Sequence, residues 1–439
     1  MTNTVSATHP YIEALLKGYE TPHGGVSWLN ERRARALERA NALTVPTTRD
    51  EEWRFTDISP LTRLHFQPAS EALQLSLADL SHYVIGEAAG RLVFVDGLFA
   101  PELSATDGLP AGVQVSNLAE GLKHHGALIE PHLARHVPFD GNLFAALNTC
   151  YLRDGALIRV ARDQVHAAPV HLLFVSTRPE IAAYPRCLVI AESGSGCAVI
   201  EDYVALHDGV YFNNAVTEIA VAANARVRHV KLQRESLGSF HIANCAVSLA
   251  KDAAYASHTV TLGARMSRHN LNVVQQGEGA DARIDGLALI YGRQLADTHT
   301  LLDHAKPNGK SVQLHKCIVG GAAHAVFNGK VLVREGAQLT DSAQQSRNLL
   351  LSSKAHVDTK PQLEIFADDV KCSHGATVGQ LDTEQVFYLK SRGLSESRAR
   401  SLLTYAFGAE IIDRIPVPSL VARLEQIVLE QTQTSPTGC

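Results

Sequence analysis

Strand-like segments recur in the middle of this chain at an almost constant interval. Most of them open with a turn-forming or small residue and continue as alternating or β-branched residues. The five clearest segments begin at Gly196, Asn224, Asp252, Asp281 and Lys310, so the intervals between them are 28, 28, 29 and 29 residues. A fixed period of this length is typical of a stacked repeat, in which a unit buries its apolar side only against its neighbours.

The same pattern constrains how the strands are connected. No helical pattern separates the strand-like segments, which argues against β-α-β units. We therefore expect a mainly β protein whose core is a parallel β-helix, a form of β-solenoid. A β-sandwich whose strands are evenly spaced by coincidence is the alternative that the pattern leaves open.

Helical patterns precede the repeats. The segment "SWLNERRARALERANAL" begins at Ser27, which is expected to be an N-cap. Its apolar residues fall on one helical face: Leu29, Ala36, Leu37, Ala40 and Leu43.

Helical patterns also follow the repeats. Asp382 and Gln385 have the spacing of a capping box, Gly393 is a natural C-cap, and Ser395 opens a second helix. That helix has one apolar stripe: Ala399, Leu402, Leu403, Ala406, Phe407 and Ile411. A last amphipathic helix carries Leu420, Leu424, Ile427 and Val428. The chain is thus expected to divide into an N-terminal helical or mixed domain (1–150), a β-helix core (151–381) and a C-terminal helical domain (382–439).

Composition excludes several classes of function. Charged residues make up 19% of the 439 residues and the net charge is −5, so nucleic acid is not expected as a partner. The start has no secretory pattern, and no apolar run approaches the roughly 18 residues of a membrane span. The seven cysteines are odd in number and form no C-x-x-C. We expect reduced thiols in the cytoplasm, without a zinc finger or a self-contained cysteine-ligated cluster.

The usual enzyme motifs are incomplete. "HAKPNGKS" ends like a P-loop, but His304 occupies the first glycine position and a strand follows, so this chain is not expected to bind a nucleotide. "GEGADA" also leads into a strand, and neither G-x-S-x-G nor H-E-x-x-H occurs. We expect no stand-alone enzyme. The rival class is a β-helix enzyme acting on carbohydrate, which would need clustered carboxylates such as Asp281, Asp285, Asp297 and Asp303.

The segment "DDVKCSHGATVGQLD", from Asp368 to Asp382, places Cys372 and His374 two residues apart. In an extended strand these side chains share one face, with Cα atoms about 7 Å apart, so both could approach one soft metal ion. Two ligands leave a coordination shell incomplete. A packed cysteine beside a hydrogen-bonded histidine is the other interpretation.

Long composite motifs in the second half of the chain resemble the SufB/SufD family of iron–sulfur cluster assembly proteins. They include "QQSRNLLLS", "TKPQLEI" and "SHGATVGQLD", and "RDEEWRFTDIS" (Arg49 to Ser59) is similar to the SufD branch. SufB members carry Glu-His-Glu-Ala-Thr where this chain has Ser373 to Thr377, and a functional cysteine where this chain has Ile365. The sequence therefore resembles SufD more than SufB.

The resemblance implies a parallel β-helix between helical segments and a complex of one SufB, one SufD and two SufC ATPase subunits. It implies a non-enzymatic scaffold that pairs with SufB through the core, at the interface where the cluster forms. His374 matches the interface histidine of the family, and Cys372 lies beside it; both are expected to hold the nascent iron–sulfur cluster transiently, with the cysteine of SufB. A purely structural partner of SufB is the alternative.

The resemblance also assigns the C-terminal helices to SufC. ATP-driven SufC dimerisation would move these helices and open the SufB–SufD interface. The residues expected to contact SufC are Arg398, Arg400, Tyr405 and Glu410. An isolated chain is expected to be able to form a homodimer in place of the heterodimer.

Overall fold

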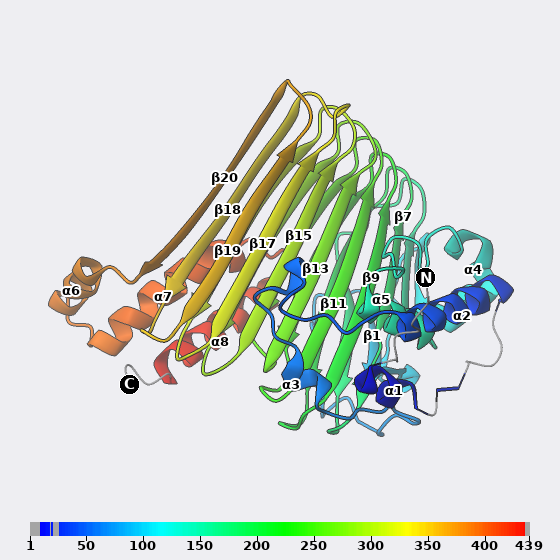
Figure 1. The fold of residues 1–439 in the computed structure, drawn as a ribbon, viewed down its shortest axis with the longest axis horizontal. Coiled ribbons are helices and arrows are strands. Elements are labelled where there is room, and N and C mark those ends of the chain that lie inside the picture. The colour runs from blue at the N-terminus through cyan, green and yellow to red at the C-terminus, as the bar shows by residue number, and fades with distance from the viewer. Residues whose placement is uncertain (1–8, 18, 21–25, 435–439) are drawn as a thin grey trace, which may run out of the picture.

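The computed structural model describes residues 9–17, 19–20 and 26–434. Strands dominate the chain and wind into an elongated parallel β-solenoid with helices on its flanks (Figure 1). The expected parallel β-helix is confirmed, and the β-sandwich alternative is wrong. Of the helices in the described part of the chain, none is long and apolar enough to cross a membrane.

Two sheets form the walls of the solenoid. The first consists of β2 (Leu98–Phe99), β1 (Gly90–Val95), β5 (Val170–Ser176), β8 (Gly196–Ala205), β10 (Arg226–Arg234), β12 (Ala254–Thr261), β14 (Asp281–Ile290), β16 (Lys310–Val319), β18 (Thr340–Leu350) and β20 (Val370–Gln380), in that spatial order. The second consists of β19 (His356–Ile365), β17 (His324–Val333), β15 (Leu295–His304), β13 (Met266–Gln275), β11 (Phe240–Leu249), β9 (Phe212–Val221), β7 (Arg186–Ala191), β4 (Ala156–Val160) and β3 (Val113–Asn117), and β6 (Ala182–Ala183) pairs with β9. Pairing is parallel except between β1 and β2 and between β3 and β4.

The register defines the length of a coil. On neighbouring strands of the first sheet, positions 196, 226, 254, 281, 310 and 341 pair in register with one another. Successive coils are therefore 27 to 31 residues long. Asn224 and Asp252, where two of the repeats were expected to begin, lie in the turns before β10 and β12. Strands β1 and β3, which precede residue 151, already belong to the two sheets.

One corner of the solenoid explains why turn-forming residues recur. A residue with a left-handed backbone occurs there once per coil, with φ between 53° and 71°: Asp163, Gly194, Asn224, Asp252, Gly279, Asn308 and Leu339. The amide of each donates to a carbonyl of the next coil, as from Asn224 to Lys251 over 3.0 Å. Glycine, asparagine and aspartate tolerate this conformation best, so the stacking of the turns selects them.

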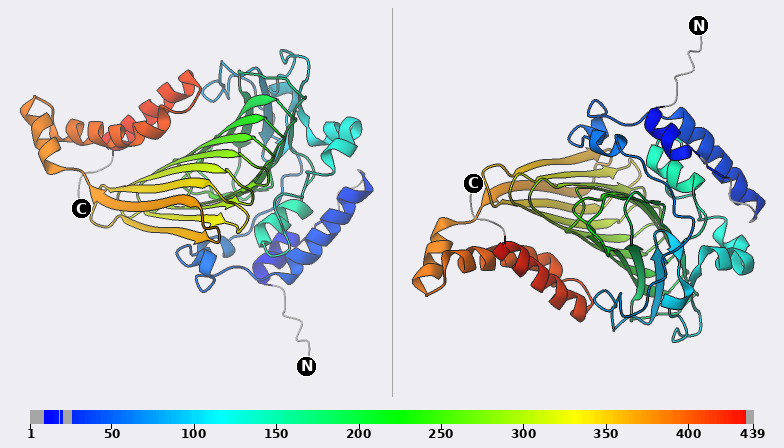
Figure 2. Two further views of the ribbon diagram at one scale, coloured as in Figure 1. Left: turned by 90° about the horizontal axis from the view of Figure 1, so that it is seen from above. Right: turned by 90° about the horizontal axis from the view of Figure 1, so that it is seen from below.

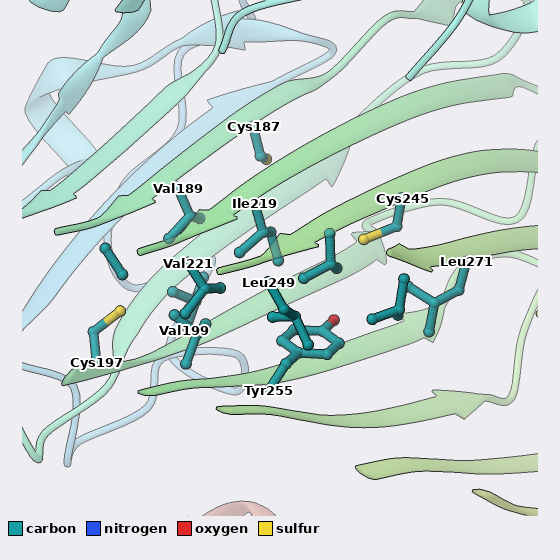
Figure 3. Packing of buried hydrophobic residues seen from close by; sticks show 14 of the residues in the cluster. Cys187, Val189, Cys197, Val199, Ile219, Val221, Cys245, Leu249, Tyr255 and Leu271 are labelled. Atoms are coloured by element: carbon teal, nitrogen blue, oxygen red, sulfur yellow. The ribbon is translucent and has the colours of Figure 1, made fainter. Parts of the chain in front are cut away.

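The interior is packed with apolar side chains. Cys187, Cys197 and Cys245 lie among aliphatic residues and Tyr255 (Figure 3). Burial raises the pKa of the Cys197 thiol to about 12, which keeps it protonated and unreactive. Of the six cysteines in the described part of the chain, five are buried and only Cys372 is half-buried.

Helices cover the outer faces of the two sheets on opposite sides (Figure 2). Helices α1 (Pro10–Leu16), α2 (Ser27–Ala42) and α5 (Leu143–Cys150) pack on β9, β11 and β13 of the second sheet. Helices α7 (Glu396–Ile412) and α8 (Pro418–Thr434) pack on β8 to β16 of the first. The remaining helical elements are α3 (Ser59–Thr62), α4 (Leu118–Ile129), α6 (Thr383–Ser391) and the 3₁₀ turns η1 (Glu51–Trp53) and η2 (Pro101–Leu103).

The structure corrects several details of the helices. Ser27 is the first helical residue and not the N-cap, which is Val26; the hydroxyl of Ser27 donates to Glu31 over 3.1 Å and caps no backbone amide. Asp382 caps α6, but its carboxylate accepts from the amide of Glu384, so Gln385 completes no capping box. Gly393 ends α6 with φ of 94°, and Ser395 caps α7 as predicted.

The predicted stripe on α7 is right at Ala399 and Ile411, which are buried, and wrong at Leu402 and Ala406, which are exposed. The buried face consists of Ala399, Ser401, Thr404, Gly408, Ile411 and Ile412, whereas the side chain of Leu402 is exposed. Small residues face the sheet because the helix approaches it closely: a Cβ atom on Gly408 would lie 3.4 Å from Ile318. The face predicted for α8 is right, since Leu420, Leu424 and Val428 are buried.

The segment around η1 is bound to the outer face of the second sheet. Glu52 accepts from His299 over 3.1 Å, Thr56 donates to Asp297 over 2.6 Å, and Arg268 lies 3.9 Å from the centre of the Trp53 ring. Burial would lower the pKa of His299, but the carboxylates of Asp297 and Glu52 outweigh it and raise that pKa. This network fixes the "RDEEWRFTDIS" segment across β13 and β15.

Candidate functional site: the open end of the solenoid

The solenoid ends in two edge strands. Strand β20 closes the first sheet and β19 the second, and neither has a further neighbour within the described residues. Most of the eleven residues of β20 are exposed (Figure 1). A long edge strand offers a row of unpaired backbone groups, which soluble proteins normally cover or interrupt. This end of the solenoid therefore leaves a row of backbone groups without a strand partner among the described residues.

Cys372 and His374 lie on β20, two residues apart in an extended strand as expected. Cys372 stands beside Ser342 of β18 in register and packs against the interior cluster, so its side chain faces the interior of the solenoid. Because alternate residues of a strand share a face, His374 is on the same side. The structure thus brings the two predicted ligands together at the mouth of the interior.

The two side chains differ in their environment. Burial raises the pKa of the Cys372 thiol, the Asp341 carboxylate adds to this rise, and a hydrogen bond with the Ser342 backbone opposes it. The thiol therefore rests protonated and loses its proton when it binds a metal ion. His374 is exposed and makes no hydrogen bond or ion pair with the described residues, which leaves its imidazole available to an incoming ligand.

A glutamine row that sequence reasoning missed leads to His374. Gln344 of β18 stands beside His374 in register and is 1% exposed. Its amide donates to Gln313 over 2.9 Å, and Gln313 donates to Thr300 over 2.7 Å. The Oε1 atom of Gln344 is buried and has no hydrogen-bond partner in the described part of the chain. It can accept a hydrogen bond from an imidazole N–H of His374 and so fix the tautomer of that ring.

Ile365 occupies the position at which SufB carries its cysteine. It is the last residue of β19 and stands beside Val333 of β17. Its side chain is 39% exposed, and the neighbouring Phe366 is 63% exposed. Strands β19 and β20 contact each other, so this apolar corner belongs to the same open end as Cys372.

The four residues predicted to contact SufC have different surroundings. Arg398 is exposed on the first turn of α7, and Arg400 is half-buried. The hydroxyl of Tyr405 donates to Glu425 of α8, and burial, followed by this contact, raises the pKa of Tyr405 to about 12. Glu410 pairs with Lys316 of β16 over 2.6 Å. Arg398 is thus the most accessible of the four.

Apolar side chains on α6 and α7 form a surface that the sequence analysis did not single out. Phe387 is 72% exposed, Tyr388 56% and Leu402 43%. Helix α6 projects beyond the strand ends, and Val386 is its only fully buried residue (Figure 1). Phe387 and Tyr388 lie on α6 and Leu402 on α7, and exposed large apolar groups of this kind are found at protein interfaces. Their exposure could not be read from the sequence because an apolar residue on a helix is more often buried.

The acidic residues of the rival enzyme class do not converge. Asp281 and Asp285 lie on the first sheet, whereas Asp297 and Asp303 lie on the second. Three of them are neutralised by arginine: Asp285 by Arg414 over 2.8 Å, Asp297 by Arg268 over 2.6 Å, and Asp303 by Arg334 over 2.6 Å. Carboxylates separated and paired in this way do not form a glycosidase pair.

Comparisons with known proteins agree with this architecture. The model for the SufBD core domain of the SUF iron–sulfur cluster assembly system matches residues 174–407, and the model for the SufBD N-terminal region matches residues 21–172. The chain is 41% identical to an iron–sulfur cluster assembly SufBD family protein of Synechocystis, over 95% of this chain and 93% of the relative. It is 38% identical to the iron–sulfur cluster assembly protein SufD of Escherichia coli, over 84% and 85% of the two chains. Protein ABCI7 of the Arabidopsis thaliana chloroplast is 34% identical over 84% and 79%. Both parts of the chain are covered, so the protein belongs to the SufBD family of iron–sulfur cluster assembly proteins and is a homologue of SufD.

Proposed function

We propose that this chain is a non-enzymatic scaffold subunit that pairs with SufB through its open solenoid end and helps to hold the nascent iron–sulfur cluster. The observation that carries the proposal is the exposure of β20 and β19 together with Cys372 and His374 at the interior mouth. The six free cysteines of the described chain suit the reducing cytoplasm, where we place this activity. Residues 151–381 would form the pairing domain and 382–439 the SufC-binding domain.

The cluster is cargo, and the two side chains have distinct roles in holding it. The thiol of Cys372 would lose its proton to solvent and bind iron as the thiolate, and the imidazole of His374 would bind through one ring nitrogen, with the buried Oε1 of Gln344 able to accept a hydrogen bond from the other. Two protein ligands leave an iron site open, so the remaining ligands come from SufB and from sulfide. Ile365, at the position where SufB has a cysteine, supplies no ligand. The two subunits would therefore contribute unequally to one shared site.

The C-terminal helices offer a physical link between SufC and this site. Glu410 at the end of α7 contacts Lys316 of β16 and Arg347 of β18, and Arg414 contacts Asp285 of β14. The side chain of Lys316 is buried, whereas that of Glu410 is 38% exposed, so solvent reaches one side of this contact. A displacement of α7 would act directly on β18, the strand that holds β20. SufC would bind Arg398, Arg400 and the apolar surface of Phe387, Tyr388 and Leu402, with Tyr405 and Glu410 transmitting the movement.

The test uses the intact complex. Wild-type chain and the variants His374→Ala and Cys372→Ser are co-expressed with SufB and SufC of the same source, and iron and acid-labile sulfide are measured per purified complex. Lys371→Ala is the matched control, because Lys371 is exposed on the other face of the same strand. We expect all variants to recruit both partners and only the first two to lose cluster.

Two outcomes would contradict the proposal. If His374→Ala and Cys372→Ser retain wild-type cluster content, this chain is a purely structural partner and the chemistry resides in SufB. If the wild-type chain recruits neither partner, the open end serves another purpose, such as pairing with a second copy of this chain.

A further inference from the structure

Three metal-binding side chains meet on the outer face of the second sheet. Strands β17 and β19 both begin with histidine, and His324 stands beside His356 in register. Neighbouring parallel strands are about 4.8 Å apart, so the two imidazoles start from adjacent backbone positions. Asp358 follows two residues after His356 and therefore lies on the same face.

The packing around these residues fixes the direction of their side chains. Val357, between His356 and Asp358, packs on the interior cluster that contains Ala323 and Ala325. The flanking side chains must point away from the interior, because strand residues alternate between the two faces. Cys372 faces the interior, so the two groups lie on different sides of the solenoid wall.

The donor atoms are already close together. Oδ2 of Asp358 lies 2.7 Å from Nε2 of His324 and 3.2 Å from Nε2 of His356. All three potential ligand atoms lie within 4.8 Å of one another. An ion with bonds of about 2.0 to 2.2 Å needs its ligand atoms roughly 3 to 3.5 Å apart, so small side-chain rotations suffice.

We propose that His324, His356 and Asp358 bind a divalent first-row transition metal ion. Two imidazoles and one carboxylate provide the mixed nitrogen and oxygen set that such ions take, in the arrangement of a facial triad with positions left open. The side chains are 29%, 64% and 24% exposed, so solvent and a partner group can reach the open positions. Strand β19 is the edge of its sheet, so a strand added beside it would approach the ion.

This site goes beyond the scaffold role and does not depend on it. It uses neither Cys372 nor His374, and its three ligands come from this chain alone. Without metal, Asp358 accepts a hydrogen bond from His324 and lies 3.2 Å from Nε2 of His356, which holds the side chains near one another and reduces the reorganisation needed for binding.

The experiment titrates the purified full-length chain with Co²⁺ under anaerobic conditions and follows the visible d–d absorption. We expect one saturable ion per chain, without the thiolate charge-transfer band that a Cys372 ligand would add. His324→Ala and Asp358→Asn should each weaken binding by at least about tenfold, the range found for groups that support a metal ligand. His82→Ala is the matched control, because His82 is exposed and lies in a distant turn.

A second variant tests whether the ion binds at this site or at Cys372 and His374. The double variant Cys372→Ser/His374→Ala should bind Co²⁺ as the wild type does. If that variant loses the ion while Asp358→Asn keeps it, the ion belongs to the assembly site and the triad is only a hydrogen-bonded cluster. The absence of saturable binding to the wild-type chain overturns the proposal as well. Asp358→Asn preserves the shape of the side chain, so circular dichroism should confirm an unchanged fold in every comparison.

Discussion

The buried pair of Arg186 and Glu218 gives a sharp test of what holds the N-terminal cap on the solenoid. Both side chains are fully buried, and the Nη2 atom of Arg186 lies 2.6 Å from Oε2 of Glu218. The carboxylate also accepts four backbone amides from Ala134 to Val137, in the loop between α4 and α5, over 2.7 to 3.1 Å. One carboxylate therefore ties a loop of the cap to strand β9.

The substitution Glu218→Gln removes the charge and preserves the shape. The amide can keep its oxygen at the Oε1 position, where three backbone amides donate. Its NH₂ group then replaces Oε2 and faces two donors, the amide of Ala134 and the guanidinium of Arg186. Breaking a buried pair from one side costs about 3–5 kcal/mol, because the remaining charge has no partner.

The assay is amide hydrogen exchange of residues 133–137. Each 1.4 kcal/mol changes an equilibrium about tenfold, so we expect local opening to increase by roughly two to three and a half orders of magnitude. The control is Glu192→Gln, which breaks a pair with Arg159 whose side chains are 26% and 22% exposed. That change should cost no more than about 1 kcal/mol. Equal effects of the two substitutions would refute the reasoning.

The pH dependence provides a second check on the same pair. Burial alone would raise the pKa of Glu218, but the charge of Arg186 and the hydrogen bonds outweigh it and lower that pKa. A lowered pKa stabilises the fold above the ordinary pKa of glutamate, and this contribution is lost as the pH falls through the lowered value. The difference between wild type and Glu218→Gln should therefore shrink in acid.

The remaining predictions concern three other contacts. The carboxylate partners of His299 raise its pKa, so its contribution to docking the segment of Glu52 is complete below about pH 6.5 and is lost as the pH rises through the raised value. Proteolysis within residues 49–58 should therefore accelerate at alkaline pH. The substitution His299→Ala should remove that pH dependence. Gly277→Ala should lower the melting temperature by several degrees, since its Cβ would lie 2.0 Å from a backbone nitrogen of the neighbouring coil, whereas Gly336→Ala meets no atom within 4 Å and should change little. Phe387→Ser should weaken co-purification of SufC at least about tenfold with an unchanged melting temperature, as expected when an exposed apolar anchor is removed, and full retention of SufC would contradict the docking surface.

The solenoid could be predicted because its cause is local and repeated. Asn224, Asp252 and Asn308 mark a turn that needs a left-handed residue in every coil, and the strands between these turns are short. The sequence analysis considered an extended conformation for Cys372 and His374, and both lie on strand β20. A period and a turn preference are properties of the sequence itself, so no knowledge of distant contacts was required.

The buried face of α7 could not be predicted, because its partners are distant in sequence. Gly408 faces Leu287 and Ile318, and the close approach of α7 to β14 and β16 favours a glycine there over a leucine. Hydrophobic periodicity instead indicated Leu402, which is exposed. The exposed apolar surface of α6 and the triad around Asp358 were hidden for the same reason, since their members meet only when coils stack.

The uncovered edge strands at the end of the solenoid affect the amount of this protein that a cell retains. A stack that stops at an uncovered strand gains free energy from whatever chain completes it, so its effective stability depends on the concentration of that chain. Copies made in excess keep an uncovered edge strand, which proteases can cleave and with which other exposed strands can pair. Given the proposed pairing with SufB, degradation of unpaired copies would match the two subunits in number without a dedicated regulator, because only an uncovered edge is open to attack.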